Sequence, residues 1–369
     1  MKYNLTVPCL FGLEGLAADE LRMLGLEDVK TENGRVNFRG SARDIALVNI
    51  CLRTGERLLL LMGEFEAKTF DNLFEGVKAL PWEEFLTRDA AFPVKGHSLN
   101  SGLHSIPDCQ RIIKKAIVTR LSAKYRILRF PETGPTFQVR FSIINDRACL
   151  YLDTTGVGLH KRGYRPNTNT APLRETLAAA IVKLCRYKGR QVFLDPFCGS
   201  GTIVIEAALA ALNRAPGLNR NFMAEAWPQL DKKLWSSVRQ EARAKEYSGQ
   251  YRITGSDIDP SAIDIARDNA RRAGVSDIIR FEVADAFSVK IPEGPGILAT
   301  NPPYGERLLD IGEAELIYHR MGKRLSGIEN WKLYILSSNP DFEMHFGKTA
   351  KKRRKLYNGM IQCQLYMYF

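Results

Sequence analysis

The chain has no apolar run long enough to cross a membrane. A transmembrane helix needs roughly 20 consecutive apolar residues, and the longest candidate, residues 176–182, ends at Lys183. Residues 1–14 contain a lysine, a proline and a glycine, and they lack the apolar stretch and small-residue cleavage site of a secretion signal. We therefore expect a cytoplasmic protein.

Clustered metal ligands are also missing. The seven cysteines form no Cys-x-x-Cys pair, and the five histidines are dispersed: Cys9, Cys51, Cys109, Cys149, Cys185, Cys198, Cys363, His97, His104, His160, His319 and His345. Structural zinc and iron–sulfur sites need closely spaced thiolates or imidazoles, so we expect no metal. An odd number of scattered cysteines is typical of reduced thiols in a cytoplasm.

Positive charge is concentrated in a few segments. The 369 residues have an ordinary globular composition, 45% hydrophobic and 25% charged, which excludes wholesale disorder. The net charge is +12, and residues 111–129, 160–190 and 348–355 together carry more positive charge than this excess. A single basic run is often only a solvated surface. Three runs favour a polyanionic partner that is contacted through its phosphates.

The first half of the chain reads as two small α+β units. Ser41 is a predicted helix N-cap, and residues 145–146 are the predicted turn of a hairpin. A glycine- and proline-containing link over 156–166 marks the main domain boundary. The predicted helices cover residues 13–24, 42–52, parts of 70–85 and 108–122, and the predicted strands cover 35–38, 58–62, 137–145 and 147–153.

After residue 170, strand and helix patterns alternate. This order predicts a parallel sheet with helices on both faces, followed by an antiparallel strand over residues 360–369. Trp227 and Trp235 lie in a long segment, 214–250, and we expect them to be core residues rather than a cover over a site. The predicted parallel strands cover residues 191–194, 251–255, 279–283, 296–300 and 332–336.

The sharpest chemical signal is the segment 192–202. A buried strand ends at Asp195 and is followed by a Gly-x-Gly turn that opens a helix, where backbone amides can donate to a ligand. The dinucleotide fingerprint needs Gly or Ala at the position of Val204, so NAD binding is disfavoured. Residues 347–349 resemble the end of a phosphate-binding loop, but Phe342 occupies the place of its first glycine.

Acids follow the next two strands as well. Asp257 lies where an open α/β sheet can present a carboxylate to both hydroxyls of a ribose. Asp285 follows the third strand, in a position to meet an adenine edge. Three successive strand ends therefore carry acids, and together they predict a site for a ligand with a ribose and an adenine.

A fourth strand end carries the segment 299–307, which contains Asn301, two prolines and Tyr304. The prolines lack N–H donors, so the loop offers rigid acceptors beside the Asn301 side-chain oxygen. Such a pocket suits a conjugated exocyclic amine, with Asn301 and the Pro302 carbonyl each accepting one N–H and Tyr304 stacking on the ring. A loop that is merely stiffened by proline is the alternative.

These motifs resemble the class I S-adenosylmethionine-dependent methyltransferases that act on amino groups. Adding the segments 171–178, 354–359 and 105–117, the chain resembles more closely the THUMP-domain RNA guanine-N2 methyltransferases, above all the bacterial enzymes of 23S rRNA. The likeness covers essentially the whole chain. Some members carry a second, fused methyltransferase domain, and no second methylation is expected here.

The resemblance implies an α/β fold: a ferredoxin-like α+β domain and a THUMP module, then a Rossmann-like class I methyltransferase domain with a mostly parallel seven-stranded sheet. The implied domains are a ferredoxin-like domain over 1–60, a THUMP RNA-binding domain over 61–155, a linker over 156–170 and the methyltransferase domain over 171–369.

Residue roles also follow from the resemblance. The residues implied to bind S-adenosyl-L-methionine are Asp195, Pro196, Cys198, Gly199, Gly201, Thr202, Asp257, Ile258, Asp285, Ala286 and Asn301. Those implied to hold the target base, and so to be catalytic, are Asn301, Pro302 and Tyr304. The basic residues expected to contact RNA are Lys114, Lys115, Arg162, Lys351, Lys352, Arg353, Arg354 and Lys355.

The implied function is methylation of guanine N2 in 23S rRNA, as part of rRNA processing, with RNA as the partner and with no membrane, metal or obligate protein partner. Guanine N2 of tRNA is the main alternative, because THUMP domains are associated with tRNA. DNA adenine-N6 and protein glutamine methyltransferases share the Asn-Pro-Pro-Tyr chemistry but leave the THUMP-like half or the basic segments unexplained. A non-catalytic RNA-binding assembly factor is the alternative from another class.

Overall fold

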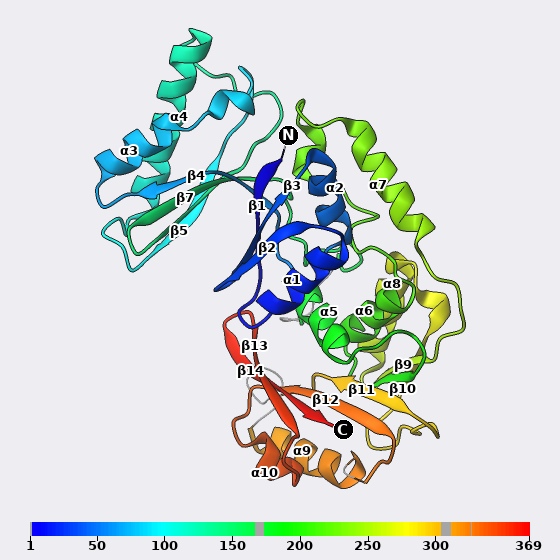
Figure 1. Cartoon of the computed structure of the whole chain (residues 1–369). Helices are drawn as coiled ribbons and strands as arrows, with labels where there is room; N and C mark the ends of the chain where they lie inside the picture. Colours follow the sequence, from blue (N-terminus) through cyan, green and yellow to red (C-terminus); the bar gives the residue numbers. More distant parts are fainter. Residues whose placement is uncertain (1, 167–172, 304–310, 326) are drawn as a thin grey trace. The chain divides into compact units, whose positions relative to one another are not determined.

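The computed structural model describes residues 2–166, 173–303, 311–325 and 327–369 (Figure 1). The chain divides into two compact units, each with its own seven-stranded sheet. Unit 1 consists of Met1–Cys9, Ala18–Leu159 and Arg220–Gln240, and unit 2 consists of Leu10–Ala17, His160–Asn219 and Glu241–Phe369.

The sheet of unit 1 has the strand order β2-β3-β1-β4-β7-β6-β5. Its strands are β1 (Tyr3–Pro8), β2 (Glu27–Glu32), β3 (Arg35–Gly40), β4 (Leu59–Glu66), β5 (Val94–Leu99), β6 (Val139–Ile144) and β7 (Arg147–Asp153). β1 pairs with β4 at Leu5 and Leu60, so the two α+β modules expected from the sequence share one continuous sheet. Only the β5–β6 pair is parallel among the pairs of this sheet in the described residues.

Local signals explain where several elements of this half begin and end. Its helices are α1 (Glu14–Met23), α2 (Ala42–Cys51), α3 (Phe70–Ala79) and α4 (Ile106–Tyr125). Ser41 caps α2 as predicted, since its side chain accepts from the Asp44 amide and the Asp44 carboxylate accepts from the Ser41 amide at 2.8 Å. Asn145 and Asp146 both have positive φ between β6 and β7, which is the predicted two-residue hairpin turn.

Residues 220–240 complete the core of unit 1, although unit 2 flanks them in the sequence. Trp227 is buried, its ring stacks on Phe137 with the centroids 4.7 Å apart, and its indole N–H donates to the Thr136 carbonyl at 3.0 Å. Trp235, on α7 (Lys232–Ala244), is also buried and stacks on Phe222. The expectation that both tryptophans are core residues is confirmed.

The sheet of unit 2 has the strand order β10-β9-β8-β11-β12-β14-β13. Its strands are β8 (Val192–Asp195), β9 (Ile253–Asp257), β10 (Ile279–Val283), β11 (Gly296–Thr300), β12 (Trp331–Ser337), β13 (Lys352–Asn358) and β14 (Ile361–Tyr368). The first five strands in the order are parallel, and β14 and β13 continue the sheet antiparallel. The expected mostly parallel seven-stranded sheet is confirmed.

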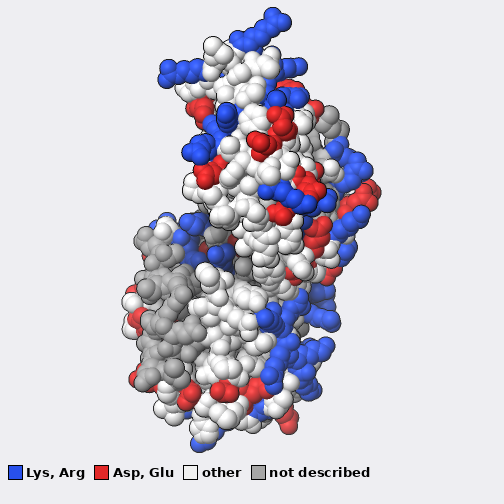
Figure 2. Space-filling model, turned by 90° about the vertical axis from the view of Figure 1, so that its left-hand side faces the viewer, with Lys and Arg blue, Asp and Glu red and all other residues white. Residues whose placement is uncertain are grey.

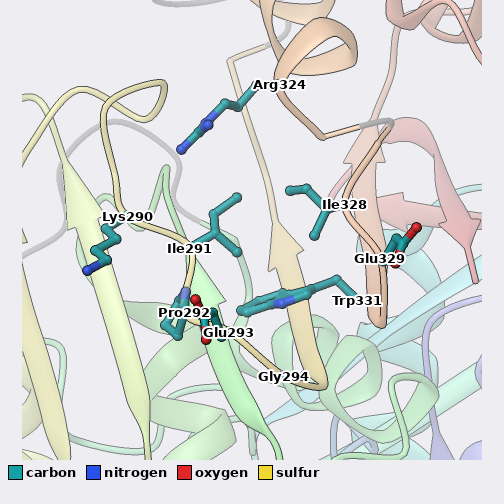
Figure 3. A pocket seen from close by; sticks show the side chains of 9 residues that line it. All are labelled: Lys290, Ile291, Pro292, Glu293, Gly294, Arg324, Ile328, Glu329 and Trp331. Atoms are coloured by element: carbon teal, nitrogen blue, oxygen red, sulfur yellow. The ribbon is translucent and has the colours of Figure 1, made fainter.

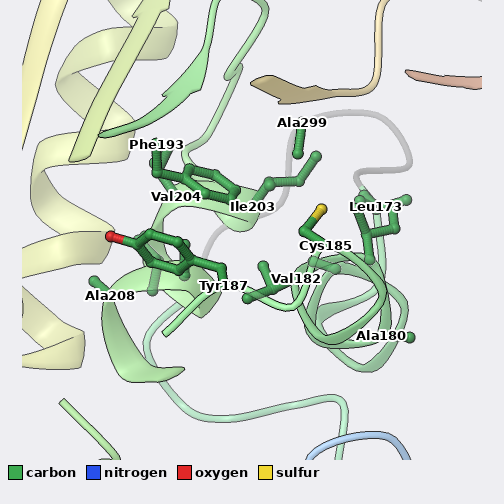
Figure 4. Packing of buried hydrophobic residues seen from close by; sticks show 14 of the residues in the cluster. Leu173, Ala180, Val182, Cys185, Tyr187, Phe193, Ile203, Val204, Ala208 and Ala299 are labelled. Carbon is green, nitrogen blue, oxygen red and sulfur yellow. The ribbon is translucent and has the colours of Figure 1, made fainter. Parts of the chain in front are cut away.

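Helices cover both faces of this sheet. They are α5 (Glu175–Leu184), α6 (Thr202–Ala211), α8 (Pro260–Ala273), α9 (Ile311–Leu325) and α10 (Phe342–Phe346). Phe193 packs with α5 and α6 on one face, close to Tyr187 and Ile203 (Figure 4), whereas its neighbours Val192 and Leu194 pack with α9 on the other. Successive strand residues alternate between faces, so β8 is buried on both sides.

Two further observations concern membranes and cysteines. Among the described residues, no helix combines the length and the apolarity that a bilayer crossing requires. All seven cysteines lie in the described ranges, and none of them forms a disulfide.

Candidate functional site

Four predicted site residues lie at the carboxyl ends of neighbouring strands of unit 2. Asp285 follows β10, Asp257 ends β9, Asp195 ends β8 and Asn301 follows β11, and these strands are adjacent in that order. The carboxyl edge of a parallel sheet is where open α/β folds bind ligands. The fold therefore brings the predicted cofactor acids and the predicted base-binding amide to one edge.

The glycine turn after β8 leaves room for a ligand. Gly199 and Gly201 both have positive φ, +50° and +81°. A Cβ added to Gly199 would meet no atom within 4 Å, so the space above the turn is open, whereas one added to Gly201 would lie 3.1 Å from the Ala266 Cβ. The turn leads into α6 at Thr202. A backbone that can be approached closely at a helix start suits the polar end of a ligand.

Asp195 is buried at the end of β8 and is held by two donors. The Thr300 hydroxyl donates to its Oδ1 at 2.6 Å, and the Phe197 amide donates to the same oxygen at 3.2 Å. Burial raises the pKa of the Asp195 carboxyl to about 7. Because Thr300 directly precedes Asn301, this hydrogen bond links the predicted cofactor acid to the residue before the predicted base-binding loop.

Asp257 is oriented by the glycine turn itself. Its Oδ2 accepts from the Gly199 amide at 2.9 Å, and its Oδ1 accepts from the Asp259 amide at 3.1 Å. Ile258, the next residue, is 72% exposed. A fixed carboxylate beside an exposed apolar side chain is suited to a ribose and the base attached to it.

Asp285 has aromatic and cationic neighbours that the sequence did not reveal. Its carboxylate accepts from the Phe287 amide at 3.0 Å and contacts the Arg320 guanidinium at 3.3 Å. The same guanidinium lies 3.7 Å from the centroid of the Phe287 ring. Phe287 and Phe197 meet edge to face, with centroids 6.2 Å apart, and line an apolar space with Pro196 and Ala286. Phe197, Phe287 and Arg320 join the candidate site.

The loop after β11 is tied to the neighbouring strand. Asn301 is half-buried and Pro302 is buried. The carbonyl of Pro303 accepts from the Tyr318 hydroxyl at 2.9 Å, and that hydroxyl lies 3.3 Å from the Ser337 hydroxyl at the end of β12. These bonds hold the start of the predicted base pocket. The predicted stacking residue, Tyr304, lies outside the described residues.

Arg162 is not available to RNA, and its prediction as a phosphate contact is wrong. Its side chain is 2% exposed, and its Nε lies 3.4 Å from the Glu206 carboxylate, which also accepts from the Tyr164 hydroxyl. Nearby, Arg165 contacts Glu175 at 3.0 Å and donates to the Thr202 hydroxyl at 3.0 Å. Together they form a buried ionic cluster of Arg162, Tyr164, Arg165, Glu175, Thr202 and Glu206. Counting basic residues along the sequence could not distinguish them from surface charges.

The other residues predicted to contact RNA differ in whether their side chains already contact other groups of the protein. The Lys114 ammonium contacts Glu132 at 2.6 Å and the Phe92 carbonyl at 3.1 Å, whereas Lys115 is exposed. On β13, the Arg353 guanidinium pairs with Glu343 and Arg354 donates to the Gly12 carbonyl. Lys351, Lys352 and Lys355 are exposed on or next to this edge strand.

A cavity of about 410 Å³ lies away from the candidate site (Figure 3). Trp331 begins β12 and Gly294 comes shortly before β11, so this cavity lies at the amino ends of the strands, opposite Asp195 and Asn301. Its lining residues are Lys290, Ile291, Pro292, Glu293, Gly294, Arg324, Ile328, Glu329 and Trp331. None of them is a predicted site residue.

Three family models match consecutive parts of the chain. They are an RMKL-like methyltransferase domain over residues 162–367, an RlmL ferredoxin-like domain over 4–59 and a THUMP domain over 67–153. These matches agree with the expected order of ferredoxin-like, THUMP and Rossmann-like parts. They cover the unit 2 sheet up to residue 367 and the strands of the unit 1 sheet except Tyr3 and residues 60–66 of β4.

Curated relatives and solved structures match along the full length. YpsC of Bacillus subtilis, named provisionally as an RNA methyltransferase, is 43% identical over 100% of this chain and 96% of its own. The ribosomal RNA large subunit methyltransferase K/L of Syntrophotalea carbinolica is 35% identical over 99% of this chain, which spans about half of that relative, 53%. The structure of SMU.472, described provisionally as a methyltransferase and complexed with SAH, has a TM-score of 0.95 and 42% identity, covering 100% of this chain and 98% of its own.

Proposed function

The chain belongs to the RMKL-like methyltransferase family, and from that membership we propose that it transfers a methyl group from S-adenosylmethionine to the exocyclic N2 amine of a guanine in 23S rRNA. The protein is an S-adenosylmethionine-dependent RNA methyltransferase of the K/L type. To this we add the base, the atom that is methylated and the RNA molecule.

One observation carries the proposal. The cofactor acids Asp285, Asp257 and Asp195 and the base-binding Asn301 follow one another along the carboxyl edge of four adjacent strands. The hydrogen bond between Thr300 and Asp195 connects the last of the three acids to the strand that leads to Asn301. A methyltransferase needs its methyl donor and its acceptor base side by side, and this order supports that arrangement.

The residues present fit the cofactor. The open space above Gly199 and the buried carboxyl of Asp195 suit its methionine end, and the fixed carboxylate of Asp257 suits its ribose hydroxyls. We propose that Asp285 and Ala286, with Phe197 and Phe287, flank its adenine. The full proposed set is the one predicted from the sequence: Asp195, Pro196, Cys198, Gly199, Gly201, Thr202, Asp257, Ile258, Asp285, Ala286 and Asn301.

The proposed mechanism depends on orientation of the amine. Bound S-adenosylmethionine supplies an electrophilic methyl group. Asn301 Oδ1 and the Pro302 carbonyl each accept one N–H of the target amine, which aims the nitrogen lone pair at that methyl group. Well-aligned reactants can gain about 7–11 kcal/mol of the barrier from orientation alone. The sulfur–methyl bond of the donor would break as the nitrogen–methyl bond forms, and the nitrogen would then release one proton to water, so no strong base is required before the attack. Tyr304 is proposed to stack on the target base.

The choice of RNA and the domain division are parts of the same proposal. The THUMP match and the names of the K/L relatives support rRNA as the substrate. The matches at 4–59, 67–153 and 162–367 support a ferredoxin-like domain over 1–60, a THUMP domain over 61–155, a linker over 156–170 and a methyltransferase domain over 171–369. We place the protein in the cytoplasm, where it would meet this RNA.

Nucleoside analysis tests the proposed function. The 23S rRNA, 16S rRNA and tRNA are separated from cells with and without the gene, and their nucleosides are identified by mass spectrometry. We expect N2-methylguanosine to be lost from 23S rRNA alone and to return when the wild-type gene, but not Asn301→Ala, is supplied. Loss from tRNA alone would contradict the choice of RNA while keeping the chemistry, and no loss in any RNA would contradict the proposal as a whole.

The protonation of Asp195 should make cofactor affinity depend on pH. Burial raises its pKa to about 7, and we propose that the ionised form binds the cofactor ammonium. Affinity for S-adenosylhomocysteine should therefore rise roughly tenfold between pH 6 and pH 8. Without the cofactor the sign is opposite: the folded-state pKa exceeds the ordinary 3.8, so the free energy of unfolding should fall as the pH rises towards 7.

Calorimetric titration of Asp195→Asn is the control for this pH dependence. The variant leaves any titration of the ligand unchanged and removes the titration of the carboxyl at position 195. We expect weak binding with a flat profile between pH 6 and pH 8. An equally steep profile in Asp195→Asn would assign the dependence to another group.

A further inference from the structure

The hairpin of β13 and β14 extends beyond the carboxyl edge of the unit 2 sheet. β14 runs antiparallel to β12, and the last residue of β12, Ser337, pairs with Gln364. Residues 361–363 therefore lie past the end of β12, and the hairpin turn at Gly359 and Met360 lies farther out. Because β11 is parallel to β12 and next to it, this is the edge that carries Asn301.

Apolar side chains are exposed on this hairpin and on the N-terminal segment that contacts it. Met360 is 99% exposed, and Phe11 is 58% exposed although it belongs to the N-terminal segment. The Phe11 ring meets the half-buried ring of Tyr357 at a centroid distance of 6.2 Å and an interplanar angle of 67°. We call Phe11, Tyr357 and Met360 the apolar platform.

Phe11 is held in place by specific contacts of the residue that follows it. Gly12 has a φ of +86°, and a Cβ at this position would lie 2.9 Å from the Lys355 carbonyl oxygen, so the two backbones approach closely. The Arg354 guanidinium donates to the Gly12 carbonyl, and the Glu14 carboxylate accepts from the Gly12 amide. An exposed phenylalanine on a fixed backbone loses little conformational freedom when a ligand stacks on it.

The charges around the platform favour a nucleic acid. Lys351, Lys352 and Lys355 are exposed, and the Lys355 ammonium lies 5.5 Å from the Tyr357 ring centroid. The carboxylate of Glu343, on α10, pairs with Arg353 of this strand rather than with one of these lysines. Figure 2 shows lysine and arginine side chains gathered on the lower right of the surface, with few acidic side chains among them.

Protection of a sheet edge explains only part of this surface. β13 is an edge strand, and lysines on edge strands prevent unwanted strand pairing. That role requires neither the exposed ring of Phe11 nor the fixed backbone beneath it. Aromatic side chains flanked by lysines are the usual means of holding unpaired nucleotides, since the base stacks and the phosphate meets the charge.

We propose that the apolar platform stacks on an unpaired RNA base next to the methylation target, with Lys351, Lys352 and Lys355 contacting the adjoining phosphates. This inference rests on the proposed RNA substrate and adds a second base site outside the pocket of Asn301. A base held there would keep the flanking nucleotide unstacked while the target guanine enters the pocket.

Binding of a single-stranded RNA that contains the fluorescent base 2-aminopurine tests the platform. Stacking on an aromatic ring quenches this base, so wild type should quench it and Phe11→Ala should quench it much less. We expect Phe11→Ala to bind roughly 5- to 150-fold more weakly, with an unchanged slope of log Kd against log salt. Replacing Lys351, Lys352 and Lys355 by alanine should instead flatten that slope, by about 0.7 for each phosphate that the protein no longer neutralises.

A matched control keeps the outcomes distinct. Tyr247→Ala removes an aromatic ring that is 62% exposed and precedes β9, a strand that four others separate from β13 in the sheet, and it should change neither affinity nor quenching. If wild type binds and methylates RNA but Phe11→Ala matches it in affinity and quenching, the proposed stacking of a base on the apolar platform is wrong. The platform would then suit a protein partner. If wild type binds no RNA, the proposed function itself fails.

Discussion

Replacing Asn301 with alanine should lower the rate of methyl transfer by roughly 100- to 1,000-fold, the usual cost of removing one preorganised hydrogen-bond partner from a reacting group. Asn301 follows Thr300, whose hydroxyl is bound to Asp195, so the backbone at this position is fixed independently of the Asn301 side chain. The loss should therefore come from misorientation of the amine. Single-turnover transfer of labelled methyl groups to RNA from cells lacking the gene measures it.

Two comparisons make the Asn301 result specific. The affinity of Asn301→Ala for S-adenosylhomocysteine should fall far less than the rate of methyl transfer, because the three acids would still hold most of the cofactor. Asn301→Asp keeps one acceptor oxygen and should retain more activity than Asn301→Ala. Equal turnover in wild type and Asn301→Ala would show that the amine is oriented elsewhere.

Replacing Arg162 with methionine should lower the free energy of unfolding by about 3–5 kcal/mol, because it leaves the Glu206 carboxylate buried without its cation. The two side chains are 2% and 0% exposed, so water cannot take the place of the guanidinium. In urea, this loss should appear as a lower midpoint with an unchanged m value.

The double variant separates removal of the pair from removal of one charge. Arg162→Met with Glu206→Leu removes both charges and should recover most of the stability, since an apolar pair can replace a buried ion pair at little cost. Lys161→Met, at the exposed neighbouring position, should change stability by no more than about 0.5 kcal/mol. A double variant as unstable as Arg162→Met would mean that the arginine acts through its packing rather than its charge.

The sequence was most informative where a strand has a clear apolar pattern. β11 is a buried apolar run and β10 alternates apolar with charged residues, and both match the predicted residues, 296–300 and 279–283. β13 was missed, since its residues are mainly Lys and Arg and only pairing with β14 makes it a strand. β2 was also missed, because it is polar and exposed and only its pairing with β3 makes it a strand.

The candidate site was predictable only as far as strand ends define it. Acids at the ends of β8, β9 and β10 meet at one edge because the strands are parallel, and parallel order follows from alternation with helices. Phe287 and Arg320 could not be found this way, since their contact depends on how α9 packs against the sheet. The burial of Arg162 likewise depends on Glu206, which is far away in the sequence.

The exchange of segments between the two halves has a consequence for protein synthesis. Phe137 leaves the ribosome early, but the tryptophan that stacks on it, Trp227, follows about 90 residues later. The core of unit 1 is thus incomplete until the first part of unit 2 has been translated. A gene fragment ending at Leu159 would encode both N-terminal modules and still lack part of their interior, so in this protein the two modules should be less stable without residues 220–240.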